Sequence, residues 1–157
     1  MYIKQILEKE GLINNIPFML MSLRETPHKH ILDGEKKYEF RSRFTKGESL
    51  AFIYVSNTVR EIQSIIYFGE AIRGNAEKLS VYDNENDSNV VEKLERYFHH
   101  SEGCAIPIKA IWRLSPINLT KLKKHFNGFV VPQSYYWLSN KPELLNILLE
   151  MEVESYD

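Results

Sequence analysis

The sequence contains a single cysteine, Cys104, among its 157 residues, so it cannot form an internal disulfide. The first segment, MYIKQILEKEG, carries charges early and has no long apolar run, a pattern typical of neither a secretory signal nor a membrane span. We therefore expect a cytoplasmic protein with no membrane contact. Because 43% of the residues are hydrophobic, a chain of this length fits one globular domain with a sizeable core.

Acidic residues are missing from positions 103–142, although the formal net charge of the whole chain is only −1. The same stretch holds six basic residues: Lys109, Arg113, Lys121, Lys123, Lys124 and Lys141. All charged residues after it are acidic. Because the field at one face depends on charges within about 10 Å, this segment is expected to attract phosphates on a nearly neutral protein. The alternative is a lysine-rich helix whose charges are simply solvated.

The sequence also lacks the common metal and cofactor motifs. His28 and His30 are two residues apart at the start of a predicted helix and point in different directions, while His99 and His100 have only Cys104 nearby. A glycine-rich phosphate loop, a nucleophile elbow, a dinucleotide-binding fingerprint and a zinc deaminase signature are all absent from the sequence. We expect neither a metal ion nor a cofactor.

Hydrophobic patterning predicts an α+β protein. Helices are expected at 2–11, 26–34 (with Thr26 as its cap), 89–98, 118–126 and 140–151. Strands are expected at 17–23, 37–44, 49–56, 62–72, 104–115 (with Pro107 marking an edge or a bulge) and 128–131, followed by an aromatic loop. Several strands around one crossover helix favour a small, partly closed β-barrel with flanking helices. We expect a helical extension at 1–16, the main domain at 17–139, and a C-terminal helix at 140–157 that packs on the same domain.

The segment GEKKYEFRSRF, residues 34–44, has an unusual distribution of charge. If residues 37–44 are extended, one face carries only ionic side chains and the other mostly aromatic ones. The ionic face consists of Lys37, Glu39, Arg41 and Arg43. The aromatic face is expected to pack on a core, whereas the ionic face is either a solvated sheet surface or the floor of a polar site.

The stretch GEKKYEFR matches the pattern G-x-K-x-x-E-x-R and therefore resembles the ASCH domains, which belong to the PUA-like superfamily together with the EVE and YTH domains. The resemblance extends over residues 17–138 and includes FMLMSL, LAFIYVS, FGEAI and IKAIWRLSPI. It implies a small PUA-like β-barrel whose cleft binds RNA or a modified nucleotide. Within this superfamily some members read modified bases in aromatic cages, some ASCH proteins cleave RNA, and a small group removes the acetyl group from acetylated cytidine.

By this resemblance Lys36, Glu39 and Arg41 occupy the motif positions at the cleft. The acetylcytidine hydrolases have Lys-Thr-x-Thr where this sequence reads KKYE at 36–39, so the hydroxyl that they use as a nucleophile is missing. A lysine and a glutamate in one cleft are nevertheless suited to general acid and base catalysis, and Lys36 and Glu39 are the catalytic candidates if the protein is an enzyme. The expected ligand-binding residues are Lys36, Glu39, Arg41, Arg43, Ser56, Lys109, Arg113, Tyr136 and Trp137.

The aromatic run Tyr135, Tyr136 and Trp137 lies inside the basic stretch and admits two interpretations. Exposed rings there would stack on nucleobases, with about 1–3 kcal/mol per base; alternatively, the run closes the core of a small domain.

Three classes of function remain open at this point. The first is a module that binds RNA or a modified nucleotide. The second is an enzyme that uses the same cleft, either a metal-independent ribonuclease or an amidohydrolase acting on a modified nucleoside. The third is a regulatory module that binds a protein partner through its terminal helices.

Overall fold

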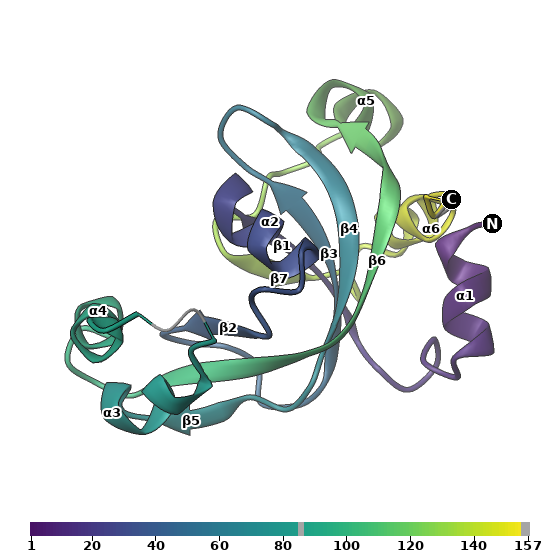
Figure 1. Cartoon of the computed structure of the whole chain (residues 1–157). Helices are drawn as coiled ribbons and strands as arrows, with labels where there is room; N and C mark the ends of the chain where they lie inside the picture. Colours follow the sequence, from purple (N-terminus) through teal and green to yellow (C-terminus); the bar gives the residue numbers. More distant parts are fainter. Residues whose placement is uncertain (85–86, 155–157) are drawn as a thin grey trace.

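The computed structural model describes residues 1–84 and 87–154 (Figure 1). The strands are β1 (Phe18–Leu23), β2 (Tyr38–Arg41), β3 (Ser49–Val55), β4 (Glu61–Phe68), β5 (Ile72–Gly74), β6 (Gly103–Asn118) and β7 (Tyr135–Trp137). The helices are α1 (Ile3–Lys9), α2 (Glu25–Leu32), α3 (Ala76–Leu79), α4 (Val90–Tyr97), α5 (Leu119–His125) and α6 (Pro142–Leu149), with a 3-10 turn η1 (Ser80–Tyr82).

The strands form one mixed sheet in the order β2-β6-β4-β3-β1-β7, and β5 also pairs with β6. Strands β1 and β3 are parallel, and the other pairs are antiparallel. The sheet curls into a half-barrel with helices around it (Figure 1). The predicted fold class, an α+β protein built on a partly closed β-barrel, is confirmed.

Strand β6 connects the two halves of the sheet. Its first residues pair with β2 and β5, and the residues after Pro107 pair with β4. The register with β4 shifts close to Pro107, between the pairs Tyr67–Ala110 and Phe68–Ile108. Because proline has no N–H to donate to the ladder, it suits a place where a strand changes partners. Of the two predictions for Pro107, the bulge is therefore correct and the edge strand is wrong.

Both faces of the sheet are covered, as β3 shows most clearly, since every one of its seven residues is buried. Phe52 and Tyr54 belong to the apolar cluster under α1 and α6, whereas Ile53 and Val55 belong to the cluster that includes Ile31 of α2. Figure 1 shows α2 on one side of the sheet and α1 and α6 on the other. Buried parallel strands typically have such continuous apolar sequences, because both faces are packed.

A third apolar cluster lies beneath α3 and α4. Tyr38 and Phe40 of β2 pack there against Leu79, Leu94 and Phe98. The aromatic face of β2 therefore packs on a core, as predicted, but Phe44 lies beyond the strand and packs on the second cluster instead.

Four predicted elements differ from the structure. The predicted strand at 128–131 does not form, and these residues have turn and irregular backbone after α5. Helix α2 begins at Glu25 with Arg24 as its cap, so Thr26 lies inside the first turn. The predicted strand 62–72 is divided into β4 and β5. The predicted aromatic loop is strand β7, because its backbone pairs with the open side of β1, as in the pair Met19–Trp137.

The two ends of the described chain lie together on the face away from α2 (Figure 1). The backbone N–H of Ile3 donates to the carbonyl of Met151 over 2.8 Å, and that of Val153 donates to the carbonyl of Met1 over 3.0 Å. Helices α1 and α6 contribute to the largest apolar cluster, so their apolar faces are already covered within the chain. None of the helices in the described part of the chain is long and apolar enough to cross a bilayer.

Helix α2 is held on the sheet by a buried polar contact. His28 is 2% exposed, and its Nε2 is hydrogen-bonded to Oγ of Ser64 over 2.8 Å. Burial, together with the positive charge of Arg113, lowers the pKa of His28 to about 4. His28 is therefore neutral in the folded protein at neutral pH.

This shift predicts a specific loss of stability in acid. Between about pH 6.5 and pH 4 the unfolded chain takes up a proton at His28 that the folded chain does not, so the free energy of unfolding falls as the pH is lowered. The full effect is on the order of 3 kcal/mol. A His28→Gln variant should lack this part of the pH dependence in urea unfolding measured at about pH 7 and pH 4.5. Equal pH dependence in both proteins would contradict the interpretation.

Candidate functional site

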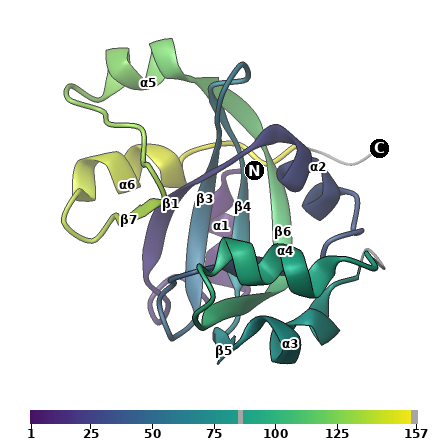
Figure 2. The same ribbon diagram turned by 90° about the vertical axis from the view of Figure 1, so that its left-hand side faces the viewer.

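A cleft of about 530 Å³ opens where β1 and β3 end and α2 begins. Figure 2 shows α2 and α4, the two helices that border it, on the side toward the viewer. The lining residues come from five separate segments: Ser22, Leu23, Arg24, Pro27, Lys36, Glu39, Phe40, Arg41, Ser56, Tyr97 and Gln133. The cleft is therefore a product of tertiary structure and not of one motif.

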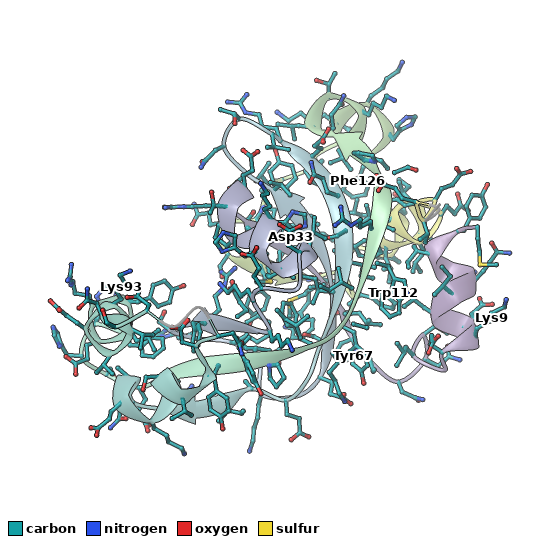
Figure 3. All side chains as sticks on the ribbon, viewed as in Figure 1. Lys9, Asp33, Tyr67, Lys93, Trp112 and Phe126 are labelled. Carbon is teal, nitrogen blue, oxygen red and sulfur yellow. The ribbon has the colours of Figure 1, made fainter. Side chains whose placement is uncertain are left out.

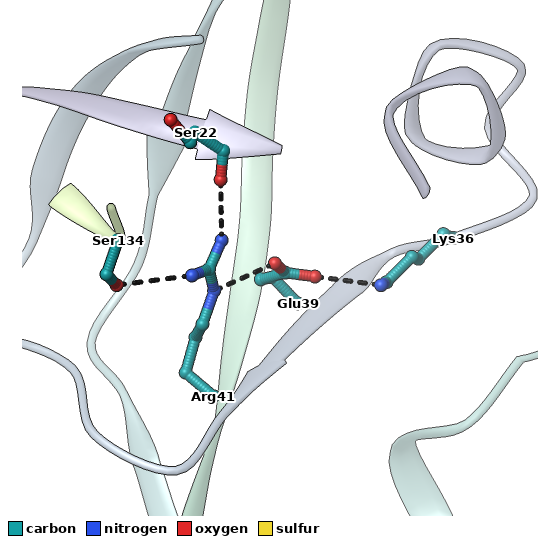
Figure 4. A network of polar contacts seen from close by, with 5 residues as sticks. All are labelled: Ser22, Lys36, Glu39, Arg41 and Ser134. Carbon is teal, nitrogen blue, oxygen red and sulfur yellow. Dashed lines mark hydrogen bonds and ion pairs between the residues drawn. The ribbon is translucent and has the colours of Figure 1, made fainter. Parts of the chain in front are cut away.

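A buried carboxylate between two cations forms the floor (Figure 4). Glu39 is only 4% exposed; its Oε1 lies 2.8 Å from Nζ of Lys36, and its Oε2 accepts a hydrogen bond from Nε of Arg41 over 3.0 Å. A buried charge is tolerated when it is paired and hydrogen-bonded, and here both carboxylate oxygens have a cationic partner.

The local sequence explains how these three side chains meet. Glu39 and Arg41 are two residues apart on β2 and share a face. Lys36 precedes the strand, where Gly34 ends α2 with a φ of +77°, a conformation that glycine adopts readily. The N–H groups of Glu35 and Lys36 both donate to the carbonyl of His30, which fixes this turn. Lys36 therefore reaches Glu39 from outside the strand.

Arg41 also joins β2 to the opposite side of the cleft. One Nη donates to the carbonyl of Ser22 over 3.1 Å, and the other donates to Oγ of Ser134 over 3.3 Å (Figure 4). Together with the bond to Glu39, these contacts use three of the five N–H groups of a guanidinium, as far as the described residues go. The remaining N–H groups can bind an acceptor in the cleft.

No protein-family model matches the sequence, and no curated protein matches it. The fold, in contrast, matches crystal structures of ZmASCH, a protein of Zymomonas mobilis. A tyrosine-to-phenylalanine variant of ZmASCH has a TM-score of 0.72 and 25% identity, over 87% of this chain and 99% of that chain. A serine-to-alanine variant also has a TM-score of 0.72 and 25% identity, over 89% of this chain and 100% of that chain. The chain folds as an ASCH domain.

A further crystal structure, of ZmASCH itself, agrees, with a TM-score of 0.71 and 24% identity over 90% of this chain. The likeness spans nearly the whole length of ZmASCH. The resemblance to ASCH domains that the motif at residues 34–41 indicated is therefore confirmed. What it establishes is a PUA-like architecture.

In this ASCH domain four of the predicted site residues line the cleft: Lys36, Glu39, Arg41 and Ser56. Ser56 follows β3, and its hydroxyl donates to the carbonyl of Leu23 over 3.3 Å. Arg43 and Lys37 were predicted to share the ionic face, but both are exposed, and β2 ends at Arg41. The period of two therefore holds only for Glu39 and Arg41.

Lys109 and Arg113 lie in an adjoining groove of about 390 Å³, which Lys36 also lines. The Nζ of Lys109 is 2.8 Å from Oε2 of Glu48, and hydrogen bonds from Lys109 and Tyr67 hold the pKa of Glu48 below its usual value. Arg113 donates to the carbonyl of Leu32 over 3.5 Å, at the end of α2. Both cations thus have partners within the chain, outside the cleft itself.

Tyr136 and Trp137 lie in β7 and pack in the two large apolar clusters instead of in the cleft. The hydroxyl of Tyr136 donates to the carbonyl of Val130 over 2.7 Å, and burial raises the pKa of Tyr136 to about 12. The ring of Trp137 contacts that of Tyr135 edge to face. Of the two interpretations of the aromatic run, these contacts favour closure of the core.

Seven of the eleven residues that line the cleft were not predicted as site residues, among them Arg24, Tyr97 and Gln133. Arg24 is exposed, Tyr97 is 48% exposed on α4, and Gln133 precedes β7. Tyr97 follows Leu94 by three residues and so continues the spacing of the apolar stripe, which means that the sequence gives no signal that its ring borders the cleft. Within residues 1–84 and 87–154, no three potential metal-binding side chains come together.

The carboxylate of Glu39 is expected to contribute to stability. In a Glu39→Gln variant the partly buried Lys36 and Arg41 would lose their counter-charge, so the free energy of unfolding should fall, by as much as about 3–5 kcal/mol. The matched control is Glu92→Gln on α4, which breaks an ion pair with Arg96 whose side chains are 68% and 72% exposed. That change should cost less than about 1 kcal/mol. If both variants lose the same free energy of unfolding in urea, the burial of the Glu39 ion pairs does not add to stability as proposed.

Proposed function

We propose that this ASCH domain binds RNA, or a modified nucleotide, in the cleft above Glu39. The observation that carries the proposal is the charge of the lining: Arg24, Lys36 and Arg41 are cationic, and Glu39 is the only acid among the described residues that line the cleft. An anionic group that enters would therefore meet a positive potential, strengthened because partly buried charges are poorly screened.

The dimensions and walls of the cleft support the same ligand. Its volume of about 530 Å³ lies within the roughly 300–1,000 Å³ typical of small-molecule sites. The free N–H groups of Lys36 and Arg41 suit phosphate oxygens or the acceptor edge of a base. Tyr97 presents a half-exposed ring at the border, and such a ring can stack on a base of any sequence.

Glu39 has a supporting role in this proposal. Because its two oxygens are occupied by Lys36 and Arg41, it fixes the position of both cations before a ligand arrives. A site whose charged groups are already oriented loses less conformational entropy on binding.

Binding to short single-stranded RNA should weaken with salt. The logarithm of the association constant should fall by about 0.7 for each phosphate contact per unit of log salt concentration. An Arg24→Gln variant should bind more weakly and lose about one such contact. Fluorescence anisotropy titrations at several salt concentrations measure both quantities.

The control for this experiment is Lys9→Gln. Lys9 lies on α1, on the side of the molecule opposite the cleft-bordering α4 that carries Lys93 (Figure 3). This variant should bind RNA as the unchanged protein does. Undetectable or salt-independent binding by the unchanged protein would contradict the proposal, and equal effects of the two substitutions would contradict the role of Arg24.

One observation favours a second candidate, an enzyme of the same fold. Nζ of Lys36 is 2.8 Å from Oε1 of Glu39, and the lysine side chain remains 20% exposed in the cleft. Such a pair can pass a proton between a ligand and the protein, as a metal-independent ribonuclease or an amidohydrolase on a modified nucleoside requires.

Turnover of RNA and of acylated nucleosides should then depend on Lys36. A Lys36→Met variant keeps the length of the side chain without its amine, so its kcat should fall by at least about 100-fold. Product formation followed by chromatography tests this. Equal turnover in both proteins would rule out the catalytic role of Lys36, and no turnover in either would reject the enzyme.

A further inference from the structure

Lys36 borders a third hollow in addition to the cleft and the adjoining groove. This pocket, of about 210 Å³, lies between β2 and the segment that carries η1 and α4. Its lining residues are Lys36, Tyr38, Phe40, Tyr82, Asp83, Asn84, Asp87, Val90, Lys93 and Leu94. Lys36 and Phe40 also line the cleft, so the two hollows share a wall.

The pocket is built largely of rings and aliphatic side chains. The rings of Tyr38 and Tyr82 are in contact, with centroids 4.8 Å apart and planes tilted by 41°. Phe40, Val90 and Leu94 complete the apolar lining. The volume of about 210 Å³ is below the roughly 300 Å³ at which sites for whole drug-sized ligands begin, and it suits a single ring system.

The two hollows differ in net charge. Among the described residues, the pocket has two amines, Lys36 and Lys93, and two carboxylates, Asp83 and Asp87, so its charges balance. The described lining of the cleft has three cations and one carboxylate. A phosphate is therefore favoured more strongly in the cleft than in the pocket, whereas an uncharged base can enter the pocket.

We infer that this pocket holds the base of the nucleotide next to the one in the cleft, with the linking phosphate at Lys36. The inference rests on the proposed function and narrows its ligand: the protein binds an RNA strand of at least two nucleotides, not an isolated nucleoside. The second base lies against the face of Tyr82.

The pocket depends on a segment outside the central part of the sheet. Tyr82 and the α4 residues belong to the connection between β5 and β6, whereas Lys36, Tyr38 and Phe40 belong to β2 and the turn before it. Recognition of the neighbouring base is thus separable from the binding of the first nucleotide.

Affinities for a ribonucleoside monophosphate and for a dinucleotide, measured by calorimetry, test the inference. The unchanged protein should bind the dinucleotide more tightly, by between about 5-fold and 150-fold, the range expected for stacking one base on a ring. A Tyr82→Ala variant should lose this gain and keep its affinity for the monophosphate. A Tyr82→Phe variant should keep both affinities, because the ring is retained.

The matched control is Val81→Ala, on the same turn, whose side chain is 76% exposed and lies outside the pocket lining. This variant should keep the gain. If Tyr82→Ala does not fold, Tyr82→Leu replaces the ring with an aliphatic group of similar position and should also lose the gain.

Equal affinities of the unchanged protein for the two ligands would overturn the inference but leave the proposed function standing, as would a gain that survives the loss of the ring at Tyr82. Failure to bind either ligand, or single-stranded RNA, would overturn both.

Discussion

The cleft depends on the pairing of Glu39 with Lys36 and Arg41. A carboxylate that is 4% exposed is stable there only because each of its oxygens meets a cation. The same pairing keeps the two cations apart and directed into the cleft. Lys36 and Arg41, which make the burial of Glu39 possible, therefore also contribute the positive charge of the cleft. Arg41 extends this link to Ser22 and Ser134 on the facing segments.

The fold supplies the frame for this contact through burial on both sides of the sheet. Strand β3 has no exposed residue, since alternate side chains enter two different apolar clusters. Helices α1 and α6 cover one of these clusters, and α2, held by His28 and Ser64, contributes to the other. The start of α2 thereby acquires a fixed position beside the ends of β1 and β3, where Arg24 borders the cleft.

Local patterns in the sequence predicted much of this arrangement. The alternation at residues 37–44 and the motif around Gly34 identified β2, Glu39 and Arg41, because those relations are set by neighbours along the chain. Arg24, Tyr97 and Gln133 reach the cleft only through long-range packing, which leaves no local pattern. Strand β7 was missed for a similar reason: its three residues form a strand by pairing with β1. Apart from Ser56, which follows β3, the predicted residues of the cleft lie within one motif, whereas Arg24, Tyr97 and Gln133 are distant from it in sequence.

The 16 residues of β6 carry a further consequence. One continuous strand pairs at its beginning with β2, which carries Glu39 and Arg41, and at its end with β4. Strand β4 in turn pairs with β3, which leads to Ser56 on the other side of the cleft. Strands that are joined through one unbroken strand are held in a fixed relation to one another, and the hydrogen bond from Arg41 to the carbonyl of Ser22 also joins β2 to β1. The width of the cleft is thus set by the fold before any ligand binds. A ligand would have to fit this width without a change in the protein, so the cleft would select ligands by size before it selects them by chemistry.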